Sequence, residues 1–339
     1  MTDLPPAPPL SDLSSVPEMP LGSAQTGVLG QYDGASPPYP DWALAALAQA
    51  PVETRLTVNG AGIEVLSWGK AGDPIVVLLH GNGACAQWWS FLAPGLAQAG
   101  YQVRAMSFSG MGGSDWRETY DMAGFVAEIC AVMDIDMGTD ASTHDTPPQK
   151  PILVGHSFGG FPALMTALSQ SVRVGGLIML DMSIVPPGEE WTGPPKRHVP
   201  NRIYPSLTQA LARFRLAPPQ ECETHWALDH IARASLKQVE GGYIWRFDPF
   251  LWNQFRFTNV SGEIGALNVP TFVMRGGLSE LMSDRIWDYM KGLFPARTAF
   301  VTIPQAAHHV MLDQPLATLA ALEAALAGLS ILPEGPARG

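Results

Sequence analysis

The chain has 339 residues, which is long for one domain and short for two, so we expect one large core with an insertion and a tail. Hydrophobic residues make up 46% and charged residues 15%, a balance typical of a folded α/β protein. The formal net charge of -11 repels phosphate backbones and anionic lipid surfaces, which argues against nucleic acid and membranes as partners.

The cysteine content and the N-terminus both indicate a cytoplasmic protein. Cys85, Cys130 and Cys222 are too few and too scattered for a disulfide framework or a zinc site. The first residues lack the basic start and apolar run of a signal peptide, and no stretch has the roughly 18 apolar residues of a membrane span. Because metal-ligand spacing and nucleotide fingerprints are also missing, we expect neither a metal nor a cofactor.

Residues 1–50 are predicted to form an N-terminal arm. Up to about Pro40 the arm is rich in Pro, Gly and Ser, and its few large apolar groups cannot offset the entropy cost of ordering. A short helix capped by Asp41 is predicted at residues 41–50. Three aromatic residues near this helix would allow the end of the arm to lie across the core: Tyr32, Tyr39 and Trp42.

Residues 51–183 and 264–332 alternate between strand and helix patterns, which predicts a mostly parallel eight-stranded sheet flanked by helices. The first two strands are predicted as antiparallel edge strands joined at Asn59-Gly60, since this dipeptide favours a tight hairpin. The predicted strands are 54–58, 63–67, 74–79, 103–108, 151–154, 176–180, 271–274 and 298–303. The predicted helices are 86–99, 120–133, 157–169, 284–293 and 316–327. The polar stretch 136–150 is predicted to be a loop without chemistry.

Residues 184–263 break this alternation and are predicted to form an inserted, mainly helical cap, with helices near 207–214 and 225–234. The stretch 241–252 gathers aromatic side chains around one arginine. Such a lining would bind an apolar or aromatic substrate, and Arg246 could orient a carboxylate. The aromatic residues could equally form the cap's own small core. The candidate substrate-binding residues of the cap are Trp245, Arg246 and Phe247.

The segment GHSFG at residues 155–159 lies between an apolar strand and a helix, as a G-x-S-x-G nucleophile elbow requires. The turn is so sharp that Gly155 and Gly159 must lack side chains, and Ser157 would then project above the sheet at a helix N-terminus. The alternative is that Ser157 only caps the helix. The context favours Ser157 as a nucleophile.

Together with LHGNG at residues 79–83, SGMGGS at 109–114 and a C-terminal histidine, this elbow resembles the α/β-hydrolase superfamily over about residues 55–329. The resemblance implies a serine hydrolase of the capped, esterase-like kind. Haloalkane dehalogenases and epoxide hydrolases of this superfamily use an aspartate nucleophile. The serine at position 157 therefore disfavours both activities.

An acyl-transfer reaction through Ser157 needs backbone donors for the oxyanion that forms. The residue after the nucleophile, Phe158, supplies one donor, and family resemblance assigns the other to Asn82. The alternative for HGNG is an ordinary strand-to-helix turn. Trp88 and Trp89, just beyond this loop, are predicted to line the floor of the site.

The resemblance places the catalytic base at His308, five residues before the acidic residue of an acidic-Gln-Pro helix start, with His309 as the alternative. The third member must accept a hydrogen bond from the far imidazole nitrogen. Glu280 is the preferred acid because it ends an RGGLSE segment after the seventh strand, although Ser279 occupies the commoner position. Asp181, at the end of the sixth strand, is the alternative acid.

We therefore expect hydrolysis of a carboxylic ester with an apolar or aromatic part through an acyl-enzyme. Hydrolysis of carbon–carbon bonds in aromatic ring-cleavage products and lactone hydrolysis are alternatives that use the same triad. A non-catalytic ligand receptor is a further alternative, because a fold does not fix a function. The expected partner is a small ester, and a homodimer is compatible with the sequence.

Overall fold

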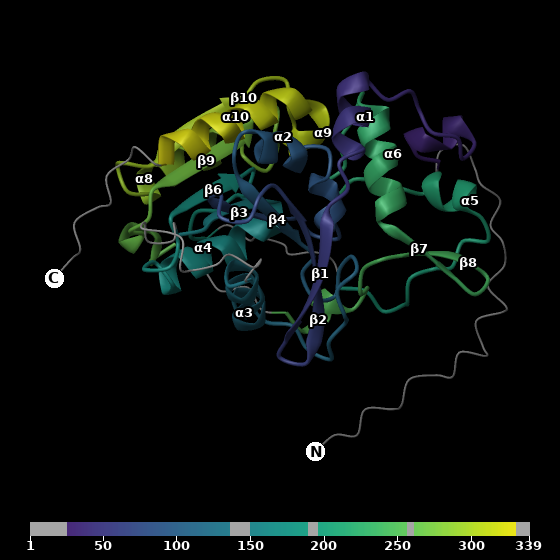
Figure 1. The fold of residues 1–339 in the computed structure, drawn as a ribbon, viewed down its shortest axis with the longest axis horizontal. Coiled ribbons are helices and arrows are strands. Elements are labelled where there is room, and N and C mark those ends of the chain that lie inside the picture. Colours follow the sequence, from purple (N-terminus) through teal and green to yellow (C-terminus); the bar gives the residue numbers. More distant parts are fainter. Residues whose placement is uncertain (1–25, 136–149, 189–195, 256–260, 330–339) are drawn as a thin grey trace, which may run out of the picture.

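The computed structural model describes residues 26–135, 150–188, 196–255 and 261–329. Within these residues an eight-stranded sheet runs in the order β1-β2-β4-β3-β5-β6-β9-β10 (Figure 1). β2 pairs antiparallel with both β1 and β4, while the other neighbouring strands are parallel. This is the mostly parallel eight-stranded sheet that the sequence predicts.

The strands of the sheet are β1 (Val52–Val58), β2 (Ala61–Trp68), β3 (Ile75–Leu79), β4 (Gln102–Met106), β5 (Ile152–His156), β6 (Gly176–Leu180), β9 (Thr271–Gly276) and β10 (Ala299–Ile303). The helices around it are α2 (Ala93–Gln98), α3 (Met122–Met133), α4 (Gly160–Ser169), α8 (Asp284–Leu293), α9 (Val310–Asp313) and α10 (Pro315–Leu329).

Helices cover both faces of the sheet because its central strands are apolar on both sides. On β3, Val76 and Leu78 pack into the cluster that contains α2 and α10. The alternate residues, Val77 and Leu79, pack into the cluster that contains α3, α4 and α8. This alternation follows from the two-residue period of a strand.

The insertion between β6 and β9 contains both helices and a hairpin. Its elements are α5 (Leu207–Leu211), α6 (His225–Ala234), β7 (Leu236–Val239), β8 (Gly242–Trp245) and α7 (Leu251–Gln254). Helices are present near the residues predicted for the mainly helical cap, and the β7–β8 hairpin is an addition that the sequence does not predict. Gly242 is required in the hairpin, since its φ is 142° and a Cβ there would lie 2.0 Å from the carbonyl oxygen of Tyr204.

The described part of the arm lies on the cap helix α6 (Figure 1). It contains a 3₁₀ turn at Val28–Tyr32 and α1 (Asp41–Leu47), and it contributes Leu29 and Ala43 to the core. The Tyr32 hydroxyl lies 2.7 Å from His225 Nδ1, and the ring centroids of Trp42 and Trp226 are 5.2 Å apart. This part of the arm therefore packs along α6, and its aromatic residues contact the cap.

The structure corrects three local predictions. β2 is an interior strand, so only β1 of the hairpin lies at an edge. The helix predicted at residues 86–99 is divided into a 3₁₀ turn, Ala86–Trp89, and α2, where Pro94 occupies the first turn. Pro40, without a side-chain hydrogen bond, is the N-cap of α1, and Asp41 lies inside the helix.

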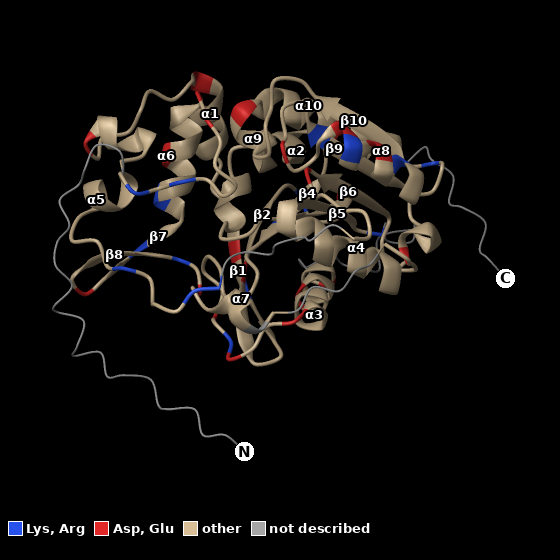
Figure 2. Ribbon diagram, turned by 180° about the vertical axis from the view of Figure 1, so that it is seen from behind, with Lys and Arg blue, Asp and Glu red and all other residues tan. Residues whose placement is uncertain are grey.

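Some predictions fall outside the described residues: the arm at 1–25, most of the polar loop at 136–149, the cap segments 189–195 and 256–260, and the end of the core from residue 330. Along the described chain, no helix combines the length and apolar character that crossing a bilayer requires. In Figure 2, Lys and Arg occupy several segments of the cap around α5, β7 and β8, and others lie near β9 and α8.

Candidate active site

The turn after β5 holds Ser157 in a strained backbone conformation. Its φ is 51°, in the left-handed region that a residue with a side chain rarely adopts. The flanking glycines make the turn feasible, because a Cβ at Gly155 would lie 2.5 Å from the carbonyl oxygen of Gly159. A Cβ at Gly159 would lie 2.6 Å from the carbonyl oxygen of Leu79 on β3. The segment thus has the geometry of the predicted nucleophile elbow.

Three polar side chains meet at the carboxyl end of the sheet. Ser157 follows β5, Asp181 follows β6 and His308 follows β10. The Nε2 atom of His308 lies 2.9 Å from Ser157 Oγ, and its Nδ1 atom lies 2.8 Å from Asp181 Oδ1. Because a carboxylate accepts, His308 Nδ1 carries the proton and Nε2 is free to accept the proton of Ser157.

The structure pairs His308 with Asp181, the alternative acid, and not with Glu280, the preferred one. The second carboxylate oxygen of Asp181 accepts a hydrogen bond from Gly276 N at 2.7 Å, and Ser279 Oγ donates to the first oxygen at 2.6 Å. Ser279 is buried and faces inward, whereas the next side chain, Glu280, is exposed. The loop after β9 therefore donates two hydrogen bonds to the carboxylate of Asp181, while its own carboxylate, Glu280, is exposed.

Two further buried histidines brace this arrangement in their neutral forms. His156 Nε2 donates to the carbonyl oxygen of His308 at 3.0 Å, and burial together with the charge of His308 lowers the pKa of His156 to about 3. His80 donates from Nδ1 to the carbonyl oxygen of Gly81 at 2.8 Å and accepts at Nε2 from Phe108 N at 3.1 Å. Burial lowers the pKa of His80 to about 4.

The loop after β3 approaches the nucleophile closely. A Cβ at Gly81 would lie 3.3 Å from Ser157 Cβ, so glycine allows this loop to pass beside the serine. The Oδ1 atom of the next residue, Asn82, accepts a hydrogen bond from the cap residue Trp252 at 2.8 Å. The Trp252 ring lies 4.9 Å from the Phe158 ring, centroid to centroid. Trp252 thus contacts both predicted oxyanion residues.

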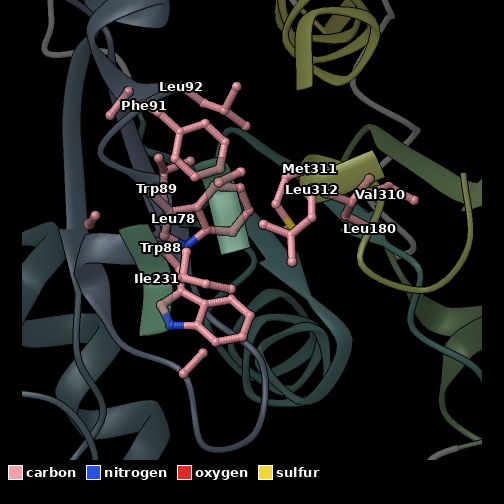
Figure 3. Packing of buried hydrophobic residues seen from close by; sticks show 14 of the residues in the cluster. Leu78, Trp88, Trp89, Phe91, Leu92, Leu180, Ile231, Val310, Met311 and Leu312 are labelled. Atoms are coloured by element: carbon pink, nitrogen blue, oxygen red, sulfur yellow. The ribbon is translucent and has the colours of Figure 1, made fainter. Parts of the chain in front are cut away.

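The two tryptophans beyond this loop have different surroundings. Trp88 lies beside the histidine loop, with its ring centroid 6.0 Å from that of His309, and its Nε1 donates to Ser235 Oγ at 3.0 Å. Trp89 belongs to the core and is 1% exposed; Figure 3 shows it near Leu78 and Phe91. Both tryptophans belong to the same buried cluster, and only Trp88 of the pair also contacts the histidine loop.

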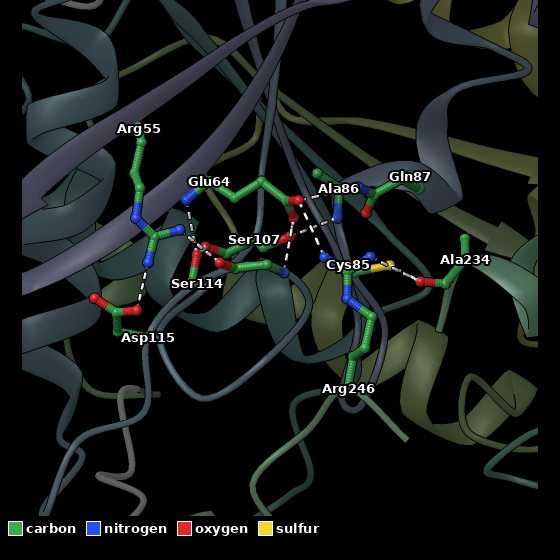
Figure 4. A network of polar contacts seen from close by, with 11 residues as sticks. Arg55, Glu64, Cys85, Ala86, Gln87, Ser107, Ser114, Asp115, Ala234 and Arg246 are labelled. Atoms are coloured by element: carbon green, nitrogen blue, oxygen red, sulfur yellow. Dashed lines mark hydrogen bonds and ion pairs between the residues drawn. The ribbon is translucent and has the colours of Figure 1, made fainter. Parts of the chain in front are cut away.

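The predicted cap residues are engaged mainly with other protein groups. Arg246 forms an ion pair with Glu64 at 3.2 Å and donates to the carbonyl oxygen of Ala234 at 3.1 Å (Figure 4). The Trp245 ring packs against those of Tyr204 and Phe214, and the Phe247 ring lies under the guanidinium of Arg197. These contacts favour the alternative that 245–247 stabilise the cap, with Arg246 neutralised by a core carboxylate.

Sequence reasoning missed Trp252 and Gln220 as neighbours of the site. Trp252 belongs to the predicted aromatic stretch, and that stretch was the available signal. Gln220, which bonds to His309 at 2.8 Å, follows two prolines in the cap and has no motif around it. Among the described residues, no group of three or more His, Cys, Asp or Glu side chains could hold a metal ion.

A comparison with models of known protein families assigns the chain to one family. Residues 76–322 match the model of the alpha/beta hydrolase family, which is more than half of the chain. The chain therefore belongs to the α/β-hydrolase family and is an enzyme of that family.

Two relatives come from Mycobacterium tuberculosis. Esterase Rv0045c is 25% identical over 269 residues, covering 77% of this chain and 85% of that protein. Epoxide hydrolase A is 30% identical over 140 residues, and this match spans 40% of each chain. The second similarity therefore covers less than half of the epoxide hydrolase.

Among solved structures, the thioesterase domain from the curacin biosynthetic pathway has a TM-score of 0.65 at 23% identity, covering 81% of this chain and 98% of that chain. The structure of Esterase Rv0045c has a TM-score of 0.61 at 20% identity, covering 88% of this chain and 95% of that chain. At these identities the likeness concerns the fold.

Proposed function

We propose that this α/β-hydrolase is a serine esterase that cleaves carboxylic esters through an acyl-enzyme on Ser157. The observation that carries the proposal is the hydrogen-bonded series from Ser157 Oγ to His308 and from His308 to Asp181, at 2.9 and 2.8 Å. A neutral imidazole with its accepting nitrogen on a serine hydroxyl activates that hydroxyl for attack on a carbonyl carbon. The similarity to Esterase Rv0045c supports the same chemistry.

In the proposed mechanism, Ser157 Oγ attacks the ester carbonyl while His308 Nε2 takes the hydroxyl proton. The backbone N–H groups of Phe158 and Asn82 stabilise the resulting oxyanion. The intermediate collapses to an acyl-enzyme as His308 returns the proton to the departing alcohol. Water then attacks the acyl group with His308 again as base, which releases the acid and restores Ser157. Asp181 keeps the imidazole in the required tautomer and stabilises its protonated form.

The surroundings of Ser157 favour an ester with an apolar or aromatic part. The rings of Phe158, Trp252 and Phe255 lie close together, with centroid separations of 4.9 to 6.2 Å. Apolar walls with a few fixed polar groups are the usual lining of a small-molecule site. The serine nucleophile argues against epoxide opening, although a relative carries that name, because epoxide hydrolases of this family use an aspartate.

The first test compares the wild type with Ser157→Ala on p-nitrophenyl esters of increasing acyl length and on aromatic monoesters. We expect turnover by the wild type and a loss of about 10⁴-fold or more in kcat for Ser157→Ala, because the acyl acceptor is gone. Ser169→Ala, at the exposed end of α4, is the matched control and should keep wild-type activity. A fluorophosphonate should label the wild type, and label Ser157→Ala far less.

Turnover that survives in Ser157→Ala would rule out the acyl-enzyme. A folded wild type that releases no product and resists the fluorophosphonate would refute ester hydrolysis. Labelling without ester turnover would instead direct the search to lactones or to carbon–carbon bonds of ring-cleavage products.

A further inference from the structure

The cap residue Gln220 bonds to the loop that carries His308. Its Oε1 atom accepts hydrogen bonds from the backbone N and the Nδ1 atom of His309, both at 2.8 Å. Its Nε2 atom donates to both carboxylate oxygens of Asp313, at 3.0 Å each. A backbone N–H can only donate and a carboxylate only accepts, so these partners fix the orientation of the amide.

Together with the bonds of Gln220, two further hydrogen bonds fix the successive residues 307–309 of the loop that carries His308. Asp313 Oδ2 accepts from Ala307 N at 2.7 Å, and the His308 carbonyl oxygen accepts from His156 at 3.0 Å. Gln220 binds the backbone N–H and the ring of the buried His309, whose carbonyl oxygen accepts from Leu312 N of α9 at 2.8 Å. Core groups therefore bind residues 307 and 308 and the carbonyl oxygen of residue 309, whereas a cap residue binds the N–H and the ring of residue 309.

We propose that Gln220 is a positioning residue that couples the docked position of the cap to the catalytic position of His308. This inference rests on the proposed function, since it concerns the base of the same site. When the cap is docked, Gln220 fixes the backbone immediately after His308 and keeps His308 Nε2 directed at Ser157 Oγ. When the cap moves away, His309 N–H loses its partner and the base is released from this geometry. The cap thus acts on the base as well as on the substrate pocket.

The donor and acceptor requirements of the bond set allow a sharp test. In Gln220→Glu, the group facing Asp313 becomes a carboxylate, so two acceptors with like charge meet. In Asp313→Asn, one of the two accepting oxygens becomes an N–H donor, so two donors meet. In the double variant, the new amide at position 313 donates to the new carboxylate at position 220, and its oxygen still accepts from Ala307 N. The carboxylate at position 220 still accepts from His309. Each single variant breaks the set and the double variant restores it.

The experiment measures kcat and KM for esters, together with melting temperature, in the wild type, both single variants and the double variant. We expect each single variant to lower kcat by roughly 10- to 100-fold, because small displacements of a catalytic base are costly. KM should change much less, and the double variant should recover most of kcat. Gln238→Glu, at an exposed cap position, controls for the added charge and should match the wild type.

Histidine ring N–H signals in ¹⁵N NMR provide a readout that does not depend on the substrate. In each single variant, the His308 Nδ1–H signal should shift or broaden together with that of His309, and both signals should return in the double variant. An unchanged His308 signal in folded single variants would overturn the coupling, whatever the activity of the wild type. Single variants with wild-type kcat, or a double variant with the product of both losses, would also overturn it. A wild type without turnover or labelling would instead refute the proposed function.

Discussion

At the scale of the residue, the two carboxylate oxygens of Asp181 accept hydrogen bonds from three donors. His308 Nδ1, Ser279 Oγ and Gly276 N all point to its two oxygens. In Asp181→Asn an amide group must face at least one of these donors, and a turn of the amide towards His308 favours the wrong tautomer. We expect kcat to fall by about 10⁴-fold with little change in KM.

The paired variant for this prediction is Glu280→Gln. Because Glu280 is exposed, its substitution should leave ester turnover within about twofold of the wild type, as for most surface changes. Steady-state kinetics on one ester, with circular dichroism to check folding, compares the two. A larger loss in Glu280→Gln than in Asp181→Asn would restore Glu280 as the acid.

The sequence predicts the nucleophile and the base from local patterns, but it offers one candidate acid after β6 and another after β9. GHSFG and the spacing from His308 to Asp313 need only a few adjacent residues to be recognised. The acid depends on which of two neighbouring strand ends faces His308, and that requires the rotation of the loop after β9. Burial of Ser279 and exposure of Glu280 are tertiary properties, so the sequence names both acids but gives the preference to Glu280.

At the scale of the element, Glu64 on β2 joins the cap to two core loops (Figure 4). Its carboxylate accepts from Ser107 Oγ at 2.6 Å and Gly113 N at 2.9 Å in the loop after β4, from Gln87 at 3.0 Å, and from Arg246 of the cap at 3.2 Å. Burial raises the pKa of Glu64, but these hydrogen bonds and the charge of Arg246 outweigh it, so the pKa is lowered overall.

Glu64→Gln should therefore lower the free energy of unfolding by roughly 1.5–3 kcal/mol, because its amide faces donors on both sides. A lowered pKa contributes stability above its ordinary value of 4.5, and this contribution is lost as the pH falls below that value. The difference in free energy of unfolding between the wild type and Glu64→Gln, measured with urea, should then shrink at acidic pH. Glu53→Gln, on the exposed part of β1, is the control. If Glu64→Gln and Glu53→Gln lost equal amounts of unfolding free energy, Glu64 would not join the cap to the core loops.

The sequence predicts helices and strands best where the buried residues follow the regular spacing of apolar residues along the chain. β6, α6 and α8 occur at the predicted residues, because each is bounded by turn residues and buries one regular pattern. The β7–β8 hairpin was missed, since Gly241-Gly242 begins an aromatic stretch that was interpreted as a pocket lining. The Glu64–Arg246 pair spans about 180 residues of sequence, so neither partner reveals the other.

At the scale of the whole molecule, the core encloses imidazole rings that must remain neutral. Burial lowers the pKa of His80 to about 4 and, with the charge of His308, lowers that of His156 to about 3. Burial and the nearby histidines also hold the pKa of His309 well below 6.5. In the unfolded chain these rings take up protons near pH 6.5, whereas in the folded protein they do not. Protonation thus favours unfolding below that pH.

The free energy of unfolding should consequently be highest above pH 6.5 and fall as the pH decreases towards 4, by up to about 1.4 kcal/mol per pH unit for each such histidine. Urea unfolding at intervals between pH 8 and pH 4.5 measures this slope. His80→Gln should be less stable at pH 8 but have a shallower slope, since one proton is no longer taken up on unfolding. His198→Gln, at an exposed position, should keep the wild-type slope. An unchanged slope in His80→Gln would mean that the pKa of His80 is the same in the folded protein as in the unfolded chain.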